Sequence, residues 1–256
     1  MNQDRRLAVL IDAENVSFRY IGFVMAELGK YGTPTIKRIF GNWTSPNLTG
    51  WKDVLNEFAI TPIQQFEYTK GKNSTDSALI IDAMDILYAK NVDGFCIISS
   101  DSDYTRLATR LRESGMFVIG MGERKTPKPF ISACEKFTYL EVLENASERQ
   151  QPLPSSSALG STKKEPPKPK ESAKLAELTQ LIISVVNDAA DDDGWAFMSE
   201  VKQQLVRRQP DFDERNYGFS KMTPLIASLG AFEITTRVNP ANPAIKLVYI
   251  RQKTEK

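Results

Sequence analysis

Residues 7–15 read LAVLIDAEN, a run of five apolar residues that stops at Asp12. A short apolar run bounded by polar residues is typical of a strand that is buried on both faces of a sheet. Five further β-rich runs follow along the chain, at 35–40, 60–65, 94–98, 117–121 and 138–140. The first half of the chain therefore predicts a sheet whose first strand is residues 7–11.

Amphipathic segments alternate with these runs. They lie at 17–30, 49–58, 75–90, 103–114 and 128–135. Strands that alternate with helices pair in parallel through right-handed crossovers, which places helices on both faces of the sheet. We therefore expect an α/β fold, a three-layer α/β/α sandwich with a parallel sheet of strand order 3-2-1-4-5.

A change of composition divides the chain in two. Residues 149–172, RQQPLPSSSALGSTKKEPPKPKES, contain almost no large apolar side chains. Such a stretch cannot bury enough surface to offset the entropy lost on ordering. We expect a flexible Pro/Ser/Lys-rich linker at 146–171, between one domain at 1–145 and another at 172–256.

The second domain has a different pattern of apolar residues. Its helices are expected at 173–189, 198–208 and 214–228, and its strands at 232–237 and 245–250. Three helices followed by a hairpin predict a small winged-helix-like domain.

The chain of 256 residues contains no histidine. Ser-His-Asp and Cys-His nucleophile systems, His-ligated zinc and imidazole acid–base catalysis are therefore excluded. Cys96 and Cys134 have no CxxC partner, which indicates two buried, reduced thiols. Any chemistry must use carboxylates, hydroxyls, amines or a bound metal.

Charge and hydropathy narrow the choice of partners. The formal net charge is +1, so a nucleic acid would have to be recognised by local patches and a metal rather than by a strongly basic domain. The apolar run at 7–11 is too short for a signal peptide or for the ~20 residues of a membrane span. We expect a cytoplasmic protein that has no membrane partner.

Four acidic residues are expected to meet at one edge of the sheet. Asp12 ends the first strand, and Asp101 and Asp103 follow the fourth, which is its neighbour at about 4.8 Å in this strand order. Asp76 lies in the first turn of the helix 75–90. Four carboxylates in one crevice repel one another unless a cation neutralises them. Their oxygen ligands suit Mg²⁺ or Mn²⁺, either of which can activate water and stabilise a departing oxyanion.

Other interpretations stay open for individual residues. Asp101 can serve simply as a helix cap. Asn15 can orient a water or a phosphate, or cap the following helix. Asp82 lies about 240° round an ideal helix from Asp76. We therefore expect Asp82 and Ser100 to support the metal ligands without contacting the metal themselves.

Three separated motifs occur in the order IDAENV, KGKNSTDSALIIDAMDIL and ISSDSDYTRLATRLRESGMFVIGMG. They resemble the NYN family, the PIN-like nuclease domains of the LabA/DUF88 group, over about residues 5–143. The resemblance implies a PIN-like Rossmannoid fold and a metal-dependent ribonuclease site. Ser99-Ser100 stands where many relatives have Ser-Gly. The family's acidic and amide positions correspond to Asp12, Asn15, Asp76, Asp82, Asp101 and Asp103.

Residues 172–251 resemble the LOTUS (OST-HTH) domain in the motifs DGW at 193–195, PDFD at 210–213 and YGF at 217–219. This resemblance implies binding of RNA, with G-rich RNA a candidate, or docking onto a protein partner. Trp195, Phe212 and Tyr217 are expected to lie in the core or to fix turns.

Basic side chains near both motif regions are candidate RNA contacts. They are Lys70, Lys72, Arg106, Lys202, Arg207, Arg208 and Lys221. The alternative for each of them is an ordinary solvated charge.

The leading hypothesis is a Mg²⁺- or Mn²⁺-dependent ribonuclease, with endonuclease favoured over exonuclease, whose LOTUS-like domain binds RNA. The alternative is a non-catalytic RNA-binding adaptor that recruits ribonucleoprotein partners. A phosphatase or nucleotide-binding enzyme is less favoured because the chain has no GxGxxG or GxxxxGK[ST] loop. DNA as the substrate and a homodimer as the assembly both stay open.

Overall fold

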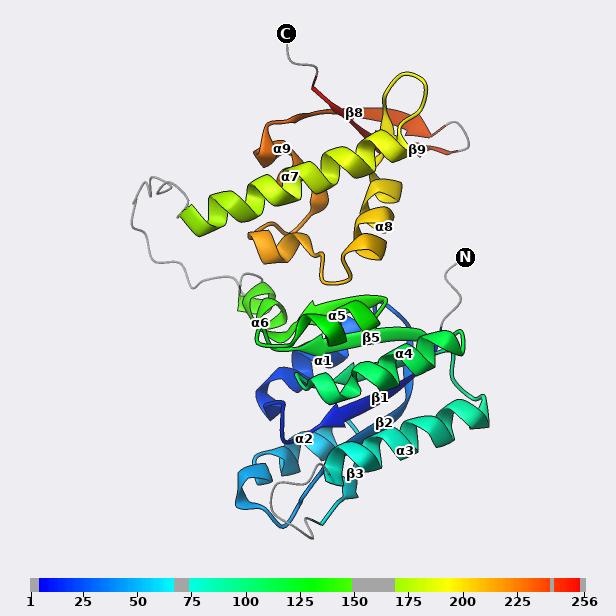
Figure 1. The fold of residues 1–256 in the computed structure, drawn as a ribbon, viewed down its shortest axis with the longest axis vertical. Helices are drawn as coiled ribbons and strands as arrows, with labels where there is room; N and C mark the ends of the chain where they lie inside the picture. The colour runs from blue at the N-terminus through cyan, green and yellow to red at the C-terminus, as the bar shows by residue number, and fades with distance from the viewer. Residues whose placement is uncertain (1–4, 67–73, 149–168, 240–241, 254–256) are drawn as a thin grey trace. The chain divides into compact units, whose positions relative to one another are not determined.

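The structure, a computed structural model, describes residues 5–66, 74–148, 169–239 and 242–253 (Figure 1). The chain separates into two compact units, Met1–Gln150 and Gln151–Lys256. The expected linker falls mostly on 149–168, outside the described residues, so its flexibility and the exact domain limits stay predictions. Both its ends are helical where the chain is described, at 146–148 and 169–171.

The first unit is built on a six-stranded parallel sheet of order β3-β2-β1-β4-β5-β6. The expected α/β sandwich and the order of its first five strands are confirmed, and β6 extends the sheet beyond β5. The strands are β1 (Arg6–Asp12), β2 (Thr33–Gly41), β3 (Thr61–Gln64), β4 (Gly94–Ile98), β5 (Phe117–Gly122) and β6 (Lys136–Tyr139).

Helices cover both faces of this sheet (Figure 1). They are α1 (Ile21–Leu28), α2 (Trp51–Glu57), α3 (Ser74–Ala89), α4 (Thr105–Glu113), α5 (Lys128–Ala133) and α6 (Leu140–Glu148). Short 3₁₀ turns precede α1, α2 and α4, so these helices begin later than the sequence predicts. Sequence reasoning missed α6, whose Leu140 and Leu143 pack into the core.

Strand β1 shows why the sheet is buried on both sides. Ala8 and Leu10 pack with α3, α4 and α5, whereas Val9 and Ile11 pack with α1, α2 and α6. All four residues have no exposed surface. Because side chains alternate along a strand, Asp12 lies on the same face as Ala8 and Leu10. The end of β1 therefore directs its carboxylate toward α3 and α4.

The two cysteines are free and buried, as the sequence predicts. Burial raises the pKa of Cys96, and it raises the pKa of Cys134 to about 12. Both thiols therefore stay protonated at neutral pH and serve as core side chains. In the part of the chain that is described, no helix is long and apolar enough to cross a lipid bilayer.

The second unit is the expected small helical domain with a hairpin. It contains α7 (Pro169–Ala189), β7 (Ala196–Phe197), α8 (Met198–Arg208), α9 (Met222–Leu229), β8 (Phe232–Asn239) and β9 (Asn242–Gln252). The three strands form an antiparallel sheet of order β7-β9-β8. The helix expected at 214–228 is interrupted, because Gly218 adopts a left-handed conformation with φ of 83° at the end of a 3₁₀ turn.

The aromatic residues of the second domain differ in their surroundings. Phe212 is buried in its core and Tyr217 packs against that core, as predicted. Trp195 belongs to the turn before β7, the other position that the sequence allowed, and its backbone N–H donates to Asp191 Oδ1 at 2.7 Å. The guanidinium groups of Arg251 and Arg237 lie over its ring, 4.6 and 5.7 Å from the centroid.

Candidate active site

Asp12 is a buried carboxylate held by several hydrogen bonds. Its side chain is 1% exposed at the end of β1. Asn15 Nδ2 and Ser99 Oγ donate to its Oδ2 at 2.7 and 2.9 Å, and the backbone N–H groups of Glu14 and Asn15 donate to Oδ1 at 3.1 and 3.3 Å. These donors take the place of the water that a buried carboxylate loses. Asp12 therefore fixes the loop after β1 to the end of β4.

Three carboxylates lie together beside Asp12. One ligand atom from each of Asp76, Asp101 and Asp103 falls within 4.8 Å of the others. Asp76 lies in the first turn of α3. Asp101 caps the 3₁₀ turn before α4 and accepts a hydrogen bond from the Asp103 backbone N–H at 2.9 Å. The cap that the sequence offered as an alternative role for Asp101 is thus present, and it orients the residue within the cluster.

The cluster contains three of the four predicted carboxylates. Asp12 is not one of the three, and its oxygens already accept the four hydrogen bonds described above. It is still close enough for its charge to raise the pKa of Asp76. The assignment of Asp12 as a further metal ligand stays a prediction.

Asp76 is the member of the cluster whose protonation is most affected. Burial raises its pKa, and the charges of Asp12, Asp101 and Asp103 raise it further, whereas a hydrogen bond from Tyr104 opposes the rise. The Tyr104 hydroxyl donates to Asp76 Oδ1 at 2.7 Å. A cation would remove the repulsion that raises this pKa, and oxygen-only ligands suit Mg²⁺ or Mn²⁺. The residues present therefore fit a divalent ion.

Sequence reasoning missed two residues that support this site. Ser99 donates to Asp12, and Tyr104 donates to Asp76. Both belong to the motif SSDSDY at 99–104, so their position beside the acidic residues was the available signal. Their hydrogen bonds follow only from the packing of β4 against β1 and of the following turn against α3.

The two residues expected to support the ligands have distinct partners. Ser100 Oγ accepts a hydrogen bond from the Glu123 backbone N–H at 2.9 Å, which joins the ends of β4 and β5. Asp82 forms an ion pair with Arg38 on β2. Asp82 therefore stabilises the contact between α3 and the sheet and lies outside the three-carboxylate cluster.

The predicted RNA contacts have different surroundings. Lys70 and Lys72 lie outside the described residues, and Arg106 is exposed on α4. In the second domain, Lys202 is paired with Glu214 at 2.8 Å, and Arg208 is paired with Asp188 and donates to Ser184 Oγ at 3.0 Å. Arg207 and Lys221 are exposed.

Comparisons with known proteins agree with both halves of this architecture. A family model described as the NYN domain matches residues 6–141, and one described as the OST-HTH/LOTUS domain matches residues 172–243. The NYN domain is a nuclease-type domain, and the OST-HTH/LOTUS domain is generally RNA-binding. The match at 6–141 contains Asp12 and the three clustered carboxylates. None of the curated proteins compared with the chain matches it.

Solved structures resemble parts of the chain. A crystal structure of a protein of unknown function from Vibrio parahaemolyticus has 17% sequence identity and a TM-score of 0.46, and the match covers 54% of this chain and 94% of that one. A solution structure of an uncharacterized protein from Nitrosomonas europaea has 25% identity and a TM-score of 0.29, covering 42% and 95%. A solution structure of a protein from Chromobacterium violaceum has 25% identity and a TM-score of 0.26, covering 31% and 83%.

Proposed function

Because this chain belongs to the NYN domain family, we propose that it is a divalent-metal-dependent ribonuclease that hydrolyses RNA phosphodiester bonds, endonucleolytically, at the carboxyl edge of its parallel sheet. The observation that carries the proposal is the group formed by Asp76, Asp101 and Asp103, whose ligand atoms lie within 4.8 Å of one another. The chain has no histidine, so this group has to supply the chemistry that imidazole provides elsewhere.

Asp76, Asp101 and Asp103 would hold a Mg²⁺ or Mn²⁺ ion. Such an ion supplies Lewis-acid activation of water and neutralises charge on the phosphate. The ion-binding oxygens come from two segments that are distant in sequence, the start of α3 and the turn before α4. Their convergence depends on the packing of both segments at the end of β4.

The protein's own residues orient these ligands. Tyr104 holds the Asp76 carboxylate through its hydroxyl, and the Asp101 cap holds the backbone of Asp103. Asp12 adds its negative charge to that of the cluster, and it fixes the Asn15 amide by accepting a 2.7 Å hydrogen bond from it. We assign Asn15 the task of positioning the substrate or its attacking water, since no described residue donates a hydrogen bond to its Oδ1.

We assign RNA capture to the LOTUS domain, with G-rich RNA as the first candidate and a protein partner as the alternative occupant. With the flexible linker that the sequence predicts between α6 and α7, this domain would raise the local concentration of RNA at the nuclease site without fixing its direction. The exposed cations Arg207 and Lys221 are the first candidate contacts in this domain. In the nuclease domain, Arg106 and the lysines at 70 and 72 are the corresponding candidates.

The test is cleavage of labelled single-stranded, hairpin and G-rich RNAs, and of matched DNA strands, with Mg²⁺, with Mn²⁺ and with EDTA. Wild type and Asp101→Asn are compared with the control Asp85→Asn, which changes an exposed acid on the same domain outside the cluster. We expect metal-dependent RNA cleavage by wild type and the control and none by Asp101→Asn, with internal fragments for endonuclease action. RNA binding by all three proteins without cleavage under any metal would contradict the proposal and favour an adaptor.

A further inference from the structure

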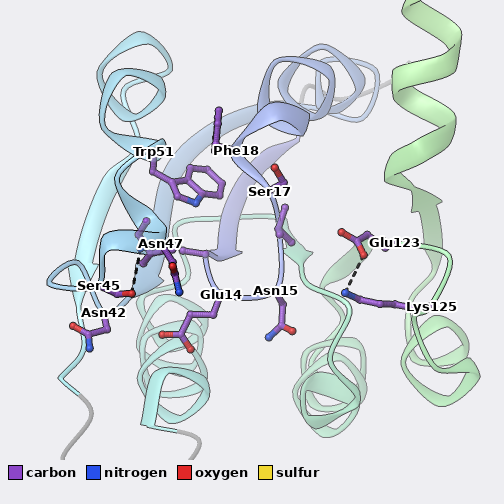
Figure 2. Close-up of a pocket in the computed structure, with 13 residues that line it drawn as sticks. Glu14, Asn15, Ser17, Phe18, Asn42, Ser45, Asn47, Trp51, Glu123 and Lys125 are labelled. Carbon is purple, nitrogen blue, oxygen red and sulfur yellow. Dashed lines mark hydrogen bonds and ion pairs between the residues drawn. The ribbon is translucent and has the colours of Figure 1, made fainter.

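Figure 2 shows the residues that line a polar cavity of about 530 Å³. The cavity lies at the carboxyl edge of the sheet, where the acidic cluster also lies. Its walls come from the segment after β1, the segment after β2 and the segment after β5. Cavities of about 300–1,000 Å³ are the size at which proteins bind small molecules or parts of larger ones. This volume is enough for a nucleobase and its sugar.

The cavity and the acidic cluster lie on opposite faces of the sheet. Val16, Leu48 and Trp51 line the cavity and belong to the core under α1 and α2. Tyr104, which holds Asp76, belongs to the core under α3, α4 and α5. The loop after β1 separates the two, and Asn15 in this loop both lines the cavity and donates to Asp12. A strand of RNA that crosses this loop would contact both places.

The polar groups of the cavity include amides that have capacity to bind a ligand. Asn42 Oδ1 accepts hydrogen bonds from Thr44 N, Thr44 Oγ1 and Gln64 Nε2, at 3.3, 2.6 and 3.2 Å. These three bonds fix the amide so that its Nδ2 donors are left over. Within the described residues, Asn42 Nδ2 and the Asn47 side chain donate no hydrogen bond to the protein. Fixed amides of this kind pair with the polar edges of bases.

The aromatic ring of Phe18 lines the cavity and is partly exposed to solvent. Phe18 is 43% exposed, and its ring meets that of the buried Trp51 edge-on, with centroids 6.4 Å apart and planes at 68°. A Cβ at Gly50 would lie 2.4 Å from Phe18 Cε1, so the ring packs directly over this glycine. Single-stranded bases stack on exposed aromatic rings of this kind.

The charges at the cavity favour a neutral group over a phosphate. Its ionisable lining residues are Glu14, Glu123 and Lys125, which sum to a net charge of −1. Lys125 Nζ lies 2.9 Å from Glu123 Oε2, so its charge is already compensated. A phosphate placed here would face an excess of negative charge. A base has hydrogen-bonding edges and a stacking face but carries no charge at neutral pH.

We propose that this cavity binds a nucleobase of single-stranded RNA next to the phosphate that the acidic cluster cleaves. The assignment to RNA rests on the proposed function, because the cluster determines which polymer reaches this edge. Asn42 and Asn47 bind the polar edge of this base, and Phe18, whose ring lies at the other end of the lining in Figure 2, provides a stacking face for the adjoining base of the same strand. The cavity thereby gives the cleavage reaction a preference for the base at one position beside the cut.

The first test uses free nucleosides in EDTA, so it does not depend on cleavage. Adenosine, guanosine, cytidine and uridine are each titrated into the ¹⁵N-labelled full chain, and the side-chain amide signals of Asn42 and Asn47 are followed. We expect at least one nucleoside to shift both signals in wild type and to shift the Asn42 signal much less in Asn47→Ala. Tyr88→Ala, which removes an exposed ring from the far end of α3, should behave as wild type. Amide signals that no nucleoside moves would overturn the proposal.

The second test combines protein and RNA changes in a cycle. Single-stranded RNAs in which one base at a time is replaced by an abasic residue are bound in EDTA to wild type, Phe18→Ala and Asn47→Ala. We expect one position where the abasic change weakens binding to wild type about 10-fold, within the range for loss of one stacked base, and hardly weakens binding to Phe18→Ala. Asn47 is exposed, so its variant keeps the test valid if Phe18→Ala folds poorly.

The outcomes separate this proposal from the proposed function. A chain that binds nucleosides in the cavity but cleaves no RNA would contradict the nuclease assignment and support the cavity as a base site. A chain that cleaves RNA with the same base preference in wild type, Phe18→Ala and Asn47→Ala would overturn the cavity assignment and leave the nuclease intact.

Discussion

The hydroxyl of Tyr104 donates a 2.7 Å hydrogen bond to Oδ1 of Asp76, which joins the turn before α4 to the first turn of α3. Tyr104 has no exposed surface, and its ring centroid lies 6.5 Å from that of Phe130 in the core. Burial and the surrounding carboxylates raise the pKa of Tyr104, so it stays protonated and remains a donor. The position of one acidic side chain of the cluster is therefore fixed by a core residue.

Tyr104→Phe tests this relationship. The change removes the hydroxyl and keeps the ring, so we expect a stability loss of only about 1 kcal/mol. Divalent-ion affinity should fall by roughly 10- to 100-fold, as for other residues that orient metal ligands. Isothermal titration with Mn²⁺ measures it, with the exposed Tyr88→Phe as the control. Unchanged affinity in Tyr104→Phe would show that Asp76 is oriented without this bond.

The pKa of Asp76 predicts how stability changes with pH in the absence of metal. Burial and neighbouring charges raise this pKa in the folded state above its value in the unfolded chain. The folded state therefore binds the proton more tightly. The resulting stabilisation is complete below the unfolded-state pKa and is lost as pH rises through the higher folded-state pKa.

Asp76→Asn isolates this effect because the amide oxygen can still accept from Tyr104. In EDTA, we expect the melting temperature of wild type to fall relative to that of Asp76→Asn as pH rises through the raised pKa. With Mn²⁺ the order should reverse above that pH, because only wild type gains the ion. Thermal melts of both proteins across pH measure this. Parallel curves in EDTA would mean that Asp76 is not affected by its neighbours.

Asp12 and Asp101 should respond differently to the same substitution. Asp12→Asn replaces a charged acceptor of four hydrogen bonds in a buried site, so we expect a loss of about 1–3 kcal/mol. Asp101→Asn keeps a residue that caps helices well and reduces repulsion in the cluster, so its stability in EDTA should stay close to wild type. Denaturant unfolding in EDTA measures both. If Asp12→Asn were fully stable and yet lost stabilisation by Mn²⁺, Asp12 would act as a fourth ligand.

The positions of the acidic residues along the chain were sufficient to predict the edge of the sheet at which they meet. Asp12 and Asp101 follow strands whose adjacency comes from the alternation of strands and helices. Local patterns could not predict the burial of Asp12 behind Ser99 or the bond from Tyr104 to Asp76, because these depend on contacts 87 and 28 residues apart in sequence. They also missed α6, since its short sequence adjoins the polar linker.

The cavity beside the cluster could not be predicted from the sequence either, because its lining residues are also distant in sequence. Phe18 and Trp51 lie on segments that follow different strands, and neither residue stands in a motif that indicates binding. Asn42 and Gln64 are brought together only by the pairing of β2 with β3. The geometry of side chains from neighbouring strand ends is set by the tertiary fold, which local hydropathy does not encode.

Asp82 is predicted to stabilise the fold without taking part in metal binding. It is paired with Arg38 across α3 and β2, and its Oδ2 is buried without a hydrogen-bond partner in the described structure. A double-mutant cycle of Asp82→Asn and Arg38→Gln should show a coupling of about 1 kcal/mol in denaturant unfolding. Mn²⁺ affinity of Asp82→Asn should match wild type. A drop in affinity as large as that of Asp76→Asn would place Asp82 in the metal site.

The four basic residues predicted to bind RNA in the second domain should separate into two pairs. Lys202 and Arg208 are paired with Glu214 and Asp188, so replacing them with alanine should lower the free energy of unfolding by no more than about 1 kcal/mol and change RNA affinity little. Arg207 and Lys221 are exposed and have no ion pair with a described residue, so each should contribute a phosphate contact. Arg207→Ala and Lys221→Ala should therefore weaken RNA binding and reduce the slope of log affinity against log salt by about 0.7 each, the value for one phosphate on a single strand. Fluorescence anisotropy with a G-rich RNA at several salt concentrations measures both quantities. Equal salt slopes in wild type and all four variants would show that RNA binds another face of this domain.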